Sequence, residues 1–520
     1  MRTARLPGVA ARFPQAGLAT PHYLASAAGA AELARGGNAV DAIVAANLAL
    51  GVVAPYLCGY GGDIFAIVWD GSLHGYLGSG RSPGRSTLDG VMDRLGGAPL
   101  LVGPHSVTVP GGPAGWFELL DRWGTRSFGE LAGDAVRYAR DGFELSPMGA
   151  TACTQFAGLY RGLDAWNTMY GSLHAGEQLR QPALARLIEL LAEEGPAAYY
   201  EGPVASAITA ALGDLGGYMD MEDLTAHRGE WVEPIRAPYR DAEIAQLPPP
   251  TQGASVLEVL RILDGFDLAA LDDVTREHVM IEAVKIGLRD RDDHISDPDH
   301  MPTPASTLFG DAWVERRRAE IDMTQASTPE PGMPQRGGTA YLCAADGDGL
   351  LVSLIQSNFL GFGSGVHVSE WGINLNNRGS SFATDPARVN AYAPGKRPMH
   401  TLIPAMVLRN GSPDLVFGSM GGDAQVQVHA QVLTKVIDDG ADPQAAIDAP
   451  RWRVEPWGWK LRAEPRFDPE LLTGLRARGH DVEETARFDS GMGHAHAIAI
   501  EDHGYGVASD PRAEGAAVGR

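Results

Sequence analysis

A threonine that directly follows two glycines, in Gly337-Gly338-Thr339, stands where it could do chemistry. If the chain is cut before Thr339, that residue gains a free α-amine, whose pKa of about 7.7–8.0 lets it act as a base near neutral pH. One residue then supplies both a hydroxyl nucleophile and its base. The same hydroxyl can make the cut by attacking the carbonyl of Gly338, which glycine leaves sterically open. On this spacing alone, a plain turn before a strand is the better interpretation.

The segment that precedes Thr339, residues 322–338, differs from the rest of the chain. It carries three prolines and three glycines and almost no large apolar residue, a composition typical of a loop. We therefore place the main boundary here. Residues 1–338 are predicted to form a large subunit that ends in the processing loop 322–338, and residues 339–520 a small subunit that begins with the nucleophile. The two together are expected to form one folding unit.

The elements that must position Thr339 change in kind at this boundary. Before it the pattern is mostly helical, and Asn38 is placed to cap a helix that runs to about Leu50. After it the pattern changes to strands, beginning with TAYLCAAD-GDG-LLVSLIQSN, which predicts a hairpin directly after Gly338. Helices and antiparallel strands mix without strict strand–helix alternation, which predicts a layered α+β fold. The main expected elements are helices at 24–35, 128–142, 274–292 and 425–437 and strands at 63–70, 402–408, 414–418, 494–501 and 504–508.

The composition of the chain disfavours several classes of protein. The 520 residues carry a net charge of -23, which disfavours binding to nucleic acid or to an anionic membrane. No stretch of eighteen apolar residues indicates a membrane span, and no signal-peptide core follows the first residues. Cys58, Cys153 and Cys343 are too few and too widely spaced for a disulfide framework or a zinc pattern. We expect a protein of the reducing cytoplasm.

Two further patterns could suggest a metal. His494 and His496 would share one face of a strand, but no nearby carboxylate or cysteine completes a site, so packing or solvent exposure is the better interpretation. Asp290, Asp292 and Asp293 are interleaved with arginines, which favours a solvated helix face. Neither glycine run, G-F-G-S-G or C-G-Y-G-G, opens a dinucleotide-binding unit. The sequence predicts neither a metal nor an organic cofactor.

Several long motifs stand in a fixed order around Thr339. In this order they resemble the gamma-glutamyltransferase family, and the resemblance covers nearly the whole chain. It implies a four-layer αββα sandwich of the N-terminal-nucleophile hydrolase type and self-cleavage into α and β chains. An (αβ)2 dimer is compatible with the resemblance, but the sequence does not decide the oligomeric state. The motifs are QSNFLGFGSG (356–365), INLNNRGSSF (373–382), PGKRPMHTLIPAM (394–406), FGSMGGDAQVQ (417–427), the opening signature over 25–65, VPGGPAGW (109–116), YYEGPVASAI (199–208), residues 278–298 and SDPR (509–512).

The resemblance also implies roles for four residues. Thr339 matches the family's processing site and nucleophile, and Ser357 matches a hydroxyl residue that hydrogen-bonds it. Gly421 and Gly422 match the backbone donors of the oxyanion hole. The residues agree with this, because two glycines between a strand and a helix put bare N–H groups near the positive helix end. The alternatives are a plain turn or a phosphate loop, and the absence of a following Gly-Lys-Ser/Thr counts against the latter.

The chain departs from the family where a true gamma-glutamyl transferase holds the substrate's α-amine. Phe359 stands at an asparagine position, Arg378 at a glutamine position and Ser381 at an aspartate position. The amine-binding acid is therefore lost and a cation is gained. An arginine favours an anionic group, which it can bind through two nitrogens. The alternative for Arg378 is a structural ion pair.

The carboxylate-binding positions are also replaced. The clamping arginine of the family aligns with Ser79, although Arg81 lies two residues on, and the paired serines become His400-Thr401. We count Arg81, His400 and Thr401, with Phe359 and Ser381, as candidate substrate-binding residues. The pattern resembles the branch that contains oxamate amidohydrolase.

Three hypotheses follow. The first is a self-processing amidohydrolase acting on a small carboxylated amide without a free α-amine, with transfer to another amine instead of water left open. Related branches add cephalosporin-acylase-like activity, or C–C bond cleavage that releases oxalate. The second hypothesis is a gamma-glutamyl transferase or glutathione hydrolase, against which Phe359, Arg378 and Ser381 argue. The third is an uncleaved binding protein, which the retained Thr339 and Ser357 disfavour.

Overall fold

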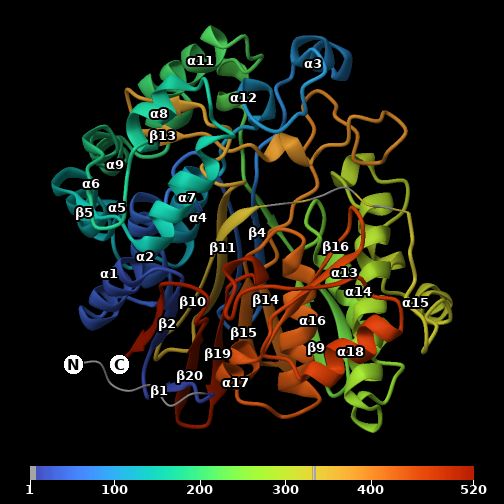
Figure 1. The fold of residues 1–520 in the computed structure, drawn as a ribbon. Helices are drawn as coiled ribbons and strands as arrows, with labels where there is room; N and C mark the ends of the chain where they lie inside the picture. The colour runs from blue at the N-terminus through green and yellow to red at the C-terminus, as the bar shows by residue number, and fades with distance from the viewer. Residues whose placement is uncertain (1–7, 331, 333–334, 336) are drawn as a thin grey trace.

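Two seven-stranded β-sheets stacked face to face form the centre of the protein (Figure 1). The computed structural model describes residues 8–330, 332, 335 and 337–520. Helices cover the outer face of each sheet, so the layers run helix, sheet, sheet, helix. This arrangement confirms the predicted α+β class and the αββα sandwich.

The first sheet takes its centre from the segment that begins at Gly338. Two antiparallel strands from after this point lie between strands from the first part of the chain. Segments on both sides of the predicted boundary therefore share one sheet. Its strand order is β21 (Ala516–Gly519), β2 (Gly17–Thr20), β10 (Gly338–Ala345), β11 (Leu351–Phe359), β3 (Asp63–Trp69), β4 (Leu73–Gly78) and β7 (Glu230–Val232).

The second sheet also mixes strands from the two parts of the chain. The two sheets enclose an apolar core between them, to which both contribute buried side chains. The strand order is β1 (Ala11–Phe13), β20 (Gly504–Ser509), β19 (Ala495–Glu501), β15 (Ser412–Ser419), β14 (Ala405–Arg409), β9 (Ala242–Gln246) and β8 (Ile235–Tyr239).

Alternation along β10 explains how one strand serves two cores. Successive side chains of a strand point to opposite faces of its sheet. Tyr341 and Cys343 lie in the core between the sheets, whereas Leu342 and Ala344 belong to the core under the helices of the first sheet. Every residue from Ala340 to Ala345 is buried, so β10 can neither shift register nor leave the sheet without exposing apolar surface.

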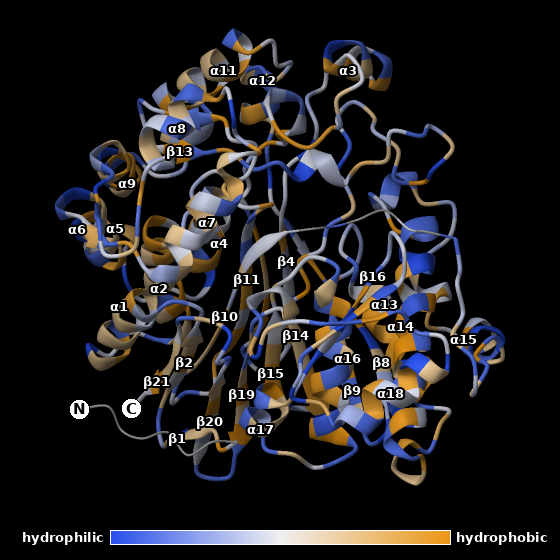
Figure 2. Cartoon of the chain, in the orientation of Figure 1, coloured by the Kyte–Doolittle hydropathy of each residue, from blue (hydrophilic) through white to orange (hydrophobic). Residues whose placement is uncertain are grey.

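The outer helices are amphipathic or fully buried, as Figure 2 shows by the orange segments that face the sheets. α2 (Ala39–Val53) is buried along its whole length and begins with a capping box between Asn38 and Asp41, which confirms the predicted cap. Other helices on the side of the first sheet are α1 (Tyr23–Ala34), α4 (Gly112–Trp123), α6 (Gly133–Asp141), α7 (Pro147–Ala157), α9 (Pro182–Glu194) and α11 (Pro203–Asp214). The second sheet is covered by α13 (Gly253–Leu263), α14 (Asp273–His294), α16 (Ala424–Ile437), α17 (Pro443–Asp448) and α18 (Pro469–Ala477).

The predicted processing loop 322–338 contains no helix or strand, in its described part, before β10 begins at Gly338. It runs beside α14, where Ser327 N donates to Glu282 at 3.0 Å. It also meets the later part of the chain, since Trp459 Nε1 donates to the Pro329 carbonyl at 2.7 Å. Residues 331, 333, 334 and 336 of this loop lie outside the described residues.

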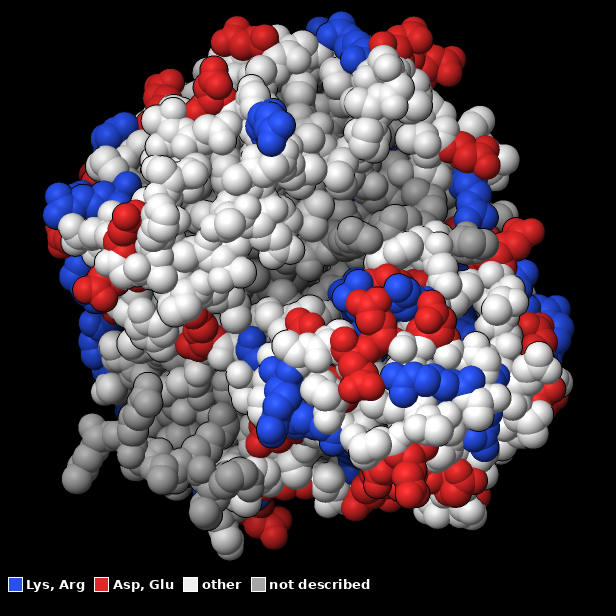
Figure 3. Space-filling model, viewed as in Figure 1, with Lys and Arg blue, Asp and Glu red and all other residues white. Residues whose placement is uncertain are grey.

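Charged side chains of both signs are closely interspersed on the lower right of the face shown in Figure 3. A small sheet of β16 (Trp452–Glu455), β17 (Lys460–Ala463) and β18 (Val482–Glu484) carries several of them. Lys460 pairs with Glu483 at 2.8 Å, and Arg462 pairs with Glu455 at 2.7 Å. Across the described residues, no helix is both long enough and apolar enough to cross a lipid bilayer.

Candidate active site

Thr339 is fully buried at the start of β10, opposite an irregularity in β11. Gly338 pairs with Phe359 and Ala340 pairs with Gln356, so two residues of β11 stand opposite the single Thr339. A bulge of this kind bends a strand and redirects one side chain. The two residues opposite Thr339 are Ser357 and Asn358.

The Ser357 hydroxyl lies between Thr339 and the carbonyl in front of it. Thr339 Oγ1 donates to Ser357 Oγ at 3.2 Å, and Ser357 Oγ donates to the Gly338 carbonyl oxygen at 2.6 Å. The backbone N–H of Phe359 donates to the same hydroxyl oxygen at 2.7 Å. A serine hydroxyl has one donor and two acceptor positions, and all three are used. The bond before Thr339 thus has a hydroxyl beside it and a hydrogen bond polarising its carbonyl.

Gly421 and Gly422 form the turn between β15 and α16, where both have positive φ angles, 133° and 60°. A Cβ on Gly422 would lie 2.1 Å from the Gln335 carbonyl oxygen and 2.9 Å from the Gly337 nitrogen. The segment in front of Thr339 therefore packs directly on this turn. Only glycine fits here, because both the backbone angle and the close approach exclude a side chain.

A buried ion pair fixes the same turn. Asp423 accepts from Gln335 N at 2.7 Å and from Arg291 Nη1 at 2.5 Å. Arg291 also donates to Gln252 Oε1, and Gln252 Nε2 donates to the Gly422 carbonyl. Sequence reasoning missed Arg291 and Asp423, although an arginine between aspartates on a mostly apolar helix was a usable signal.

The predicted solvated helix face around these residues is wrong for Asp290. Asp290 is buried and bonds Arg317, which comes from α15 (Asp311–Arg318), and its Asp292 neighbour pairs with Arg291 at 2.7 Å. Asp293 alone of the three is exposed. The reason is that α14 packs between α13 and α18, so most of its surface faces protein.

Arg378 is buried at the start of a short 3₁₀ helix, Arg378–Ser381. Its guanidinium carbon lies 4.1 Å from the centre of the Phe359 ring, within range for a cation–π contact. Nη1 donates to Thr401 Oγ1 at 3.3 Å, and Nε lies 3.6 Å from Asp63 Oδ2. Within the described residues, Nη2 has no hydrogen-bond partner. The structure therefore joins the predicted residues Phe359, Arg378 and Thr401 in one cluster.

Asp63 is the member of this cluster that sequence reasoning missed. It is fully buried at the first position of β3, paired in register with Ser357, and its Oδ2 lies 3.0 Å from His400 Nε2. The signal was a carboxylate opening the apolar run DIFAIVW, because an acid buried in a sheet needs polar partners. Asp63 thus connects the predicted nucleophile strand pair to Arg378 and His400.

Burial sets the charge states in this cluster. It raises the pKa of Asp63 to about 7, and the Arg378 guanidinium opposes the rise. Burial lowers the pKa of Arg378, and the Asp63 carboxylate opposes that change. Burial, assisted by Arg378, lowers the pKa of His400 well below its usual range. His400 is therefore neutral near pH 7; Leu402 N points at its Nδ1 at 3.4 Å, so Nε2 carries the proton and donates to Asp63.

Comparison with known sequences decides the family. The description Gamma-glutamyltranspeptidase belongs to the family profile that matches residues 25–520 of the chain. The chain belongs to the gamma-glutamyltranspeptidase family. Members of this family are hydrolases and transferases that act through an N-terminal nucleophile, so the protein is an enzyme of this class.

Relatives within the gamma-glutamyltranspeptidase family match over nearly their full length. The glutathione hydrolase-like YwrD proenzyme of Bacillus subtilis is 37% identical over 96% of this chain and 97% of its own. The oxamate amidohydrolase proenzyme of Klebsiella pneumoniae is 36% identical over the same shares. The crystal structure of cephalosporin acylase from Bacillus halodurans superposes with a TM-score of 0.93 at 35% identity, covering 100% of this chain and 98% of that one.

Two predicted residues make their contacts outside the Arg378 cluster. Arg81 pairs with Asp297 at 2.9 Å and donates to the Gly395 carbonyl, and it lines a cavity of about 510 Å³ together with Ser79. Ser381 is buried, and its carbonyl accepts from Gln335 Nε2 at 3.5 Å. Ser381 therefore contacts the segment in front of Thr339, whereas Arg81 is occupied by an ion pair beside the cavity.

The histidines considered for a metal serve packing. His494 is buried and contacts Ser490 Oγ at 2.9 Å, and His496 is buried beside the Tyr341 ring. Burial lowers the pKa of His494 to about 4, which keeps it neutral.

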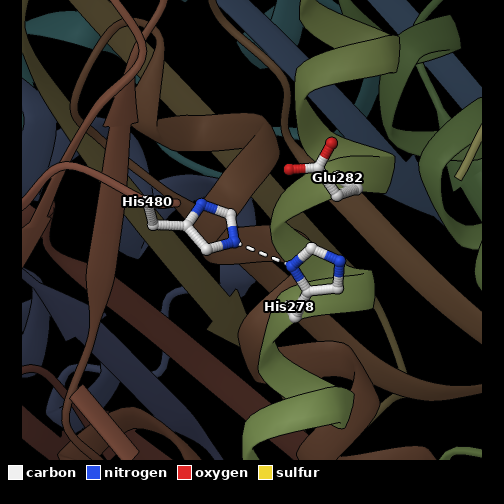
Figure 4. A group of neighbouring side chains, drawn as sticks. All are labelled: His278, Glu282 and His480. Carbon is white, nitrogen blue, oxygen red and sulfur yellow. Dashed lines mark hydrogen bonds between the residues drawn. The ribbon is translucent and has the colours of Figure 1, made fainter. Parts of the chain in front are cut away.

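One other group in the described chain brings together three side chains able to bind a metal: His278, Glu282 and His480 (Figure 4). His278 and Glu282 come from one face of α14, and His480 follows α18. His278 Nδ1 lies 2.8 Å from His480 Nε2, and its Nε2 donates to the Asp322 carbonyl at 2.7 Å. The Lys285 ammonium lies 2.7 Å from Glu282, where it already supplies a cation. We interpret the group as a link between α14, the loop after residue 321 and the later part of the chain.

Proposed function

We propose that the protein is a self-processing N-terminal-threonine amidohydrolase that cleaves the amide of a small, carboxylated, oxamate-like acyl group. The observation that carries the proposal is the pairing of two features. One is the hydroxyl relay from Thr339 through Ser357 to the Gly338 carbonyl. The other is a buried arginine, Arg378, whose Nη2 has no hydrogen-bond partner among the described residues, at a position where the transferases bind an amine.

In the self-cleavage step, Thr339 Oγ1 attacks the Gly338 carbonyl carbon. The Ser357 hydrogen bond stabilises the charge that develops on the carbonyl oxygen. The C–N bond breaks, the hydroxyl proton ends on the new amine, and Gly338 becomes an ester of the threonine side chain. Water then hydrolyses this ester, which leaves a carboxylate on Gly338 and a free α-amine on Thr339.

In turnover, the α-amine of Thr339 takes the proton from its own hydroxyl as Oγ1 attacks the substrate amide. The N–H groups of Gly421 and Gly422 hold the oxyanion once the segment packed on them has moved away. The amine or ammonia leaves with a proton, and water resolves the threonine ester. An amine in place of water would give acyl transfer.

The charge of the cluster supports a carboxylate rather than a glutamyl α-amine as the bound group. Asp63 is an acid in the cluster, but Arg378 and His400 already face its carboxylate. An ammonium group placed here would meet the Arg378 guanidinium without an acid of its own, which costs energy in a buried site. A relative that is 36% identical is named for oxamate, a small carboxylated amide.

An acylase acting on a larger acyl group is the second candidate. The cavity of about 510 Å³ beside Ser79 and Arg81 would give such a group room, and the 35% identical cephalosporin acylase supports this alternative.

A hydrolysis panel tests the proposal. Purified, fully processed protein is given oxamate, oxalyl amides, glutaryl amides and gamma-glutamyl amides at equal concentration, and Arg378→Ala is measured in parallel. We expect the short carboxylated amides to have the highest kcat/KM and Arg378→Ala to reduce it by about 10- to 100-fold, as for loss of a charged contact. If Arg378→Ala hydrolyses carboxylated substrates as well as the native protein, the specificity part of the proposal is wrong.

A further inference from the structure

The Arg378 guanidinium is held on nearly every side. The Phe359 ring covers one of its faces, at 4.1 Å from the guanidinium carbon to the ring centre. Thr401 Oγ1 accepts a hydrogen bond from Nη1 at 3.3 Å, and Asp63 Oδ2 lies 3.6 Å from Nε. The backbone nitrogen of Arg378 donates to Asn376 Oδ1 at 3.0 Å, which fixes the start of the side chain. Within the described residues, Nη2 has no hydrogen-bond partner, and Nε makes an ion pair with Asp63 but no hydrogen bond.

A buried arginine needs a counter-charge, because removing both its water and its partner is strongly unfavourable. Arg378 and Asp63 are both completely buried. No other acidic side chain of the described chain forms a salt bridge with Arg378. Within the part of the chain that the structure describes, the other side chain that hydrogen-bonds the Asp63 carboxylate is the neutral His400, which donates from Nε2. Above about pH 7, where Asp63 is ionised, its carboxylate is therefore the counter-charge of the buried guanidinium.

We infer that Asp63 is the positioning residue of the anion site: it holds Arg378 and His400 in place so that Nη2 and the Thr401 hydroxyl face the substrate's carboxylate. This inference rests on the proposed function of Arg378. Thr401 accepts from Arg378 and keeps its own hydrogen as a donor, so a carboxylate can accept from both groups. The site would bind a carboxylate end-on at one nitrogen.

The geometry also links the anion site to the nucleophile. Asp63 pairs with Ser357 across β3 and β11, and Ser357 contacts both Thr339 and Gly338. Phe359 follows on the same strand with a φ of 76°, a backbone conformation that non-glycine residues rarely adopt. Its N–H donates to Ser357 Oγ while its ring lies against Arg378. One short stretch of sheet thus fixes the distance between the attacking hydroxyl and the charge that would orient the acyl group.

The test compares Asp63→Asn, Asp63→Glu and Arg378→Ala on pairs of amides that differ only in the acyl carboxylate. We expect Asp63→Asn to raise KM for the carboxylated amide by about 10-fold or more, with a smaller change in kcat, since a mispositioned guanidinium weakens binding. KM for the matched uncharged amide should change by less than about twofold. Asp63→Glu keeps the counter-charge and should recover most of the affinity. If Asp63→Asn blocks self-cleavage, Asp63→Glu is the variant on which KM is measured.

Asp41→Asn is a matched control, because Asp41 is equally buried but belongs to the capping box at the start of α2. It should lower stability without changing the preference for a carboxylate. If Arg378→Ala loses that preference and both Asp63 variants keep it, Asp63 has no positioning role and the proposed function stands. If Arg378→Ala also keeps it, the proposed carboxylate specificity itself fails. Equal KM values for Asp63→Asn and Asp63→Glu would also overturn the inference.

Discussion

The Ser357 hydroxyl donates to the carbonyl oxygen of Gly338 at 2.6 Å, and the Thr339 hydroxyl donates to Ser357 in turn. In the proposed self-cleavage step, one side chain therefore contacts both the attacking atom and the oxygen that becomes negative. This arrangement exists only because β11 places two residues opposite Thr339. It makes self-cleavage more sensitive to Ser357 than to any other hydroxyl on the strand.

Replacing Ser357 with alanine should slow self-cleavage by about 100-fold or more, the usual cost of losing a donor to a developing oxyanion. The fraction of cleaved chain is followed on denaturing gels after purification. Ser353→Ala is the control, because Ser353 lies on the same strand and bonds Tyr341 and the Phe417 carbonyl instead. Ser353→Ala should cleave normally. Cleavage of Ser357→Ala at the native rate would remove Ser357 from the mechanism.

Thr339→Ala should remain a single chain, whereas the native protein should give two chains with the smaller one starting at Thr339. Thr339→Ser should still be cleaved, because it keeps the hydroxyl that attacks Gly338. Denaturing electrophoresis and N-terminal sequencing measure the outcome. A native protein that never splits, at any pH or age, would refute the whole proposed mechanism.

Gly422→Ala should block processing, because its Cβ would lie 2.1 Å from the Gln335 carbonyl oxygen. This oxygen belongs to the backbone, so moving a side chain cannot relieve the clash. Gly440→Ala is the matched control: its φ of 61° is nearly the same, but its Cβ would meet nothing within 4 Å. Both variants should lose about 1–2 kcal/mol from the left-handed backbone alone. Chain cleavage and thermal unfolding are measured for both. Equal processing by the two variants would show that the contact with Gln335 is unimportant.

The Asp63 pKa makes a prediction about stability and pH. Its value rises from 3.8 to about 7 on burial, so the folded chain holds a proton that the unfolded chain has released between these pH values. The contribution of Asp63 to the free energy of unfolding is complete below about pH 4, and it is lost as the pH rises through 7 and the folded chain releases the proton. Native protein should therefore lose stability relative to Asp63→Asn by a few kcal/mol, at about 1.4 kcal/mol per pKa unit, between pH 4 and 8. Chemical unfolding of both proteins at a series of pH values measures the difference, and a difference that is flat with pH would contradict it.

Sequence patterns predicted the mixed α+β class and the strand after the Gly337-Gly338 boundary because both depend on local signals, whereas the order of the four layers was implied by the family resemblance. The apolar run TAYLCAA directly after the glycine-rich boundary identifies β10, and Asn38 marks the start of α2. The same reasoning missed Asp63 and the Arg291–Asp423 pair, since each partner lies far along the chain: Asp423 is 132 residues from Arg291. It also treated Asp290 as solvated, because the sequence does not show that α14 has neighbours on several sides. Pairing across layers is a property of the folded core, which no local pattern encodes.

The His278–His480 contact predicts that the later part of the chain is held to the large segment by a buried hydrogen bond. His480 is buried, and burial with the nearby Lys285 lowers its pKa to about 3, so it contributes as a neutral ring. Replacing it with phenylalanine keeps a ring but leaves His278 Nδ1 unpartnered, which should cost about 1–3 kcal/mol. Thermal unfolding of the processed protein measures this. His503→Phe, near the exposed end of β19, is the control and should change stability by less than about 0.5 kcal/mol. Equal unfolding temperatures for the two variants would show that the contact does not stabilise the folded chain.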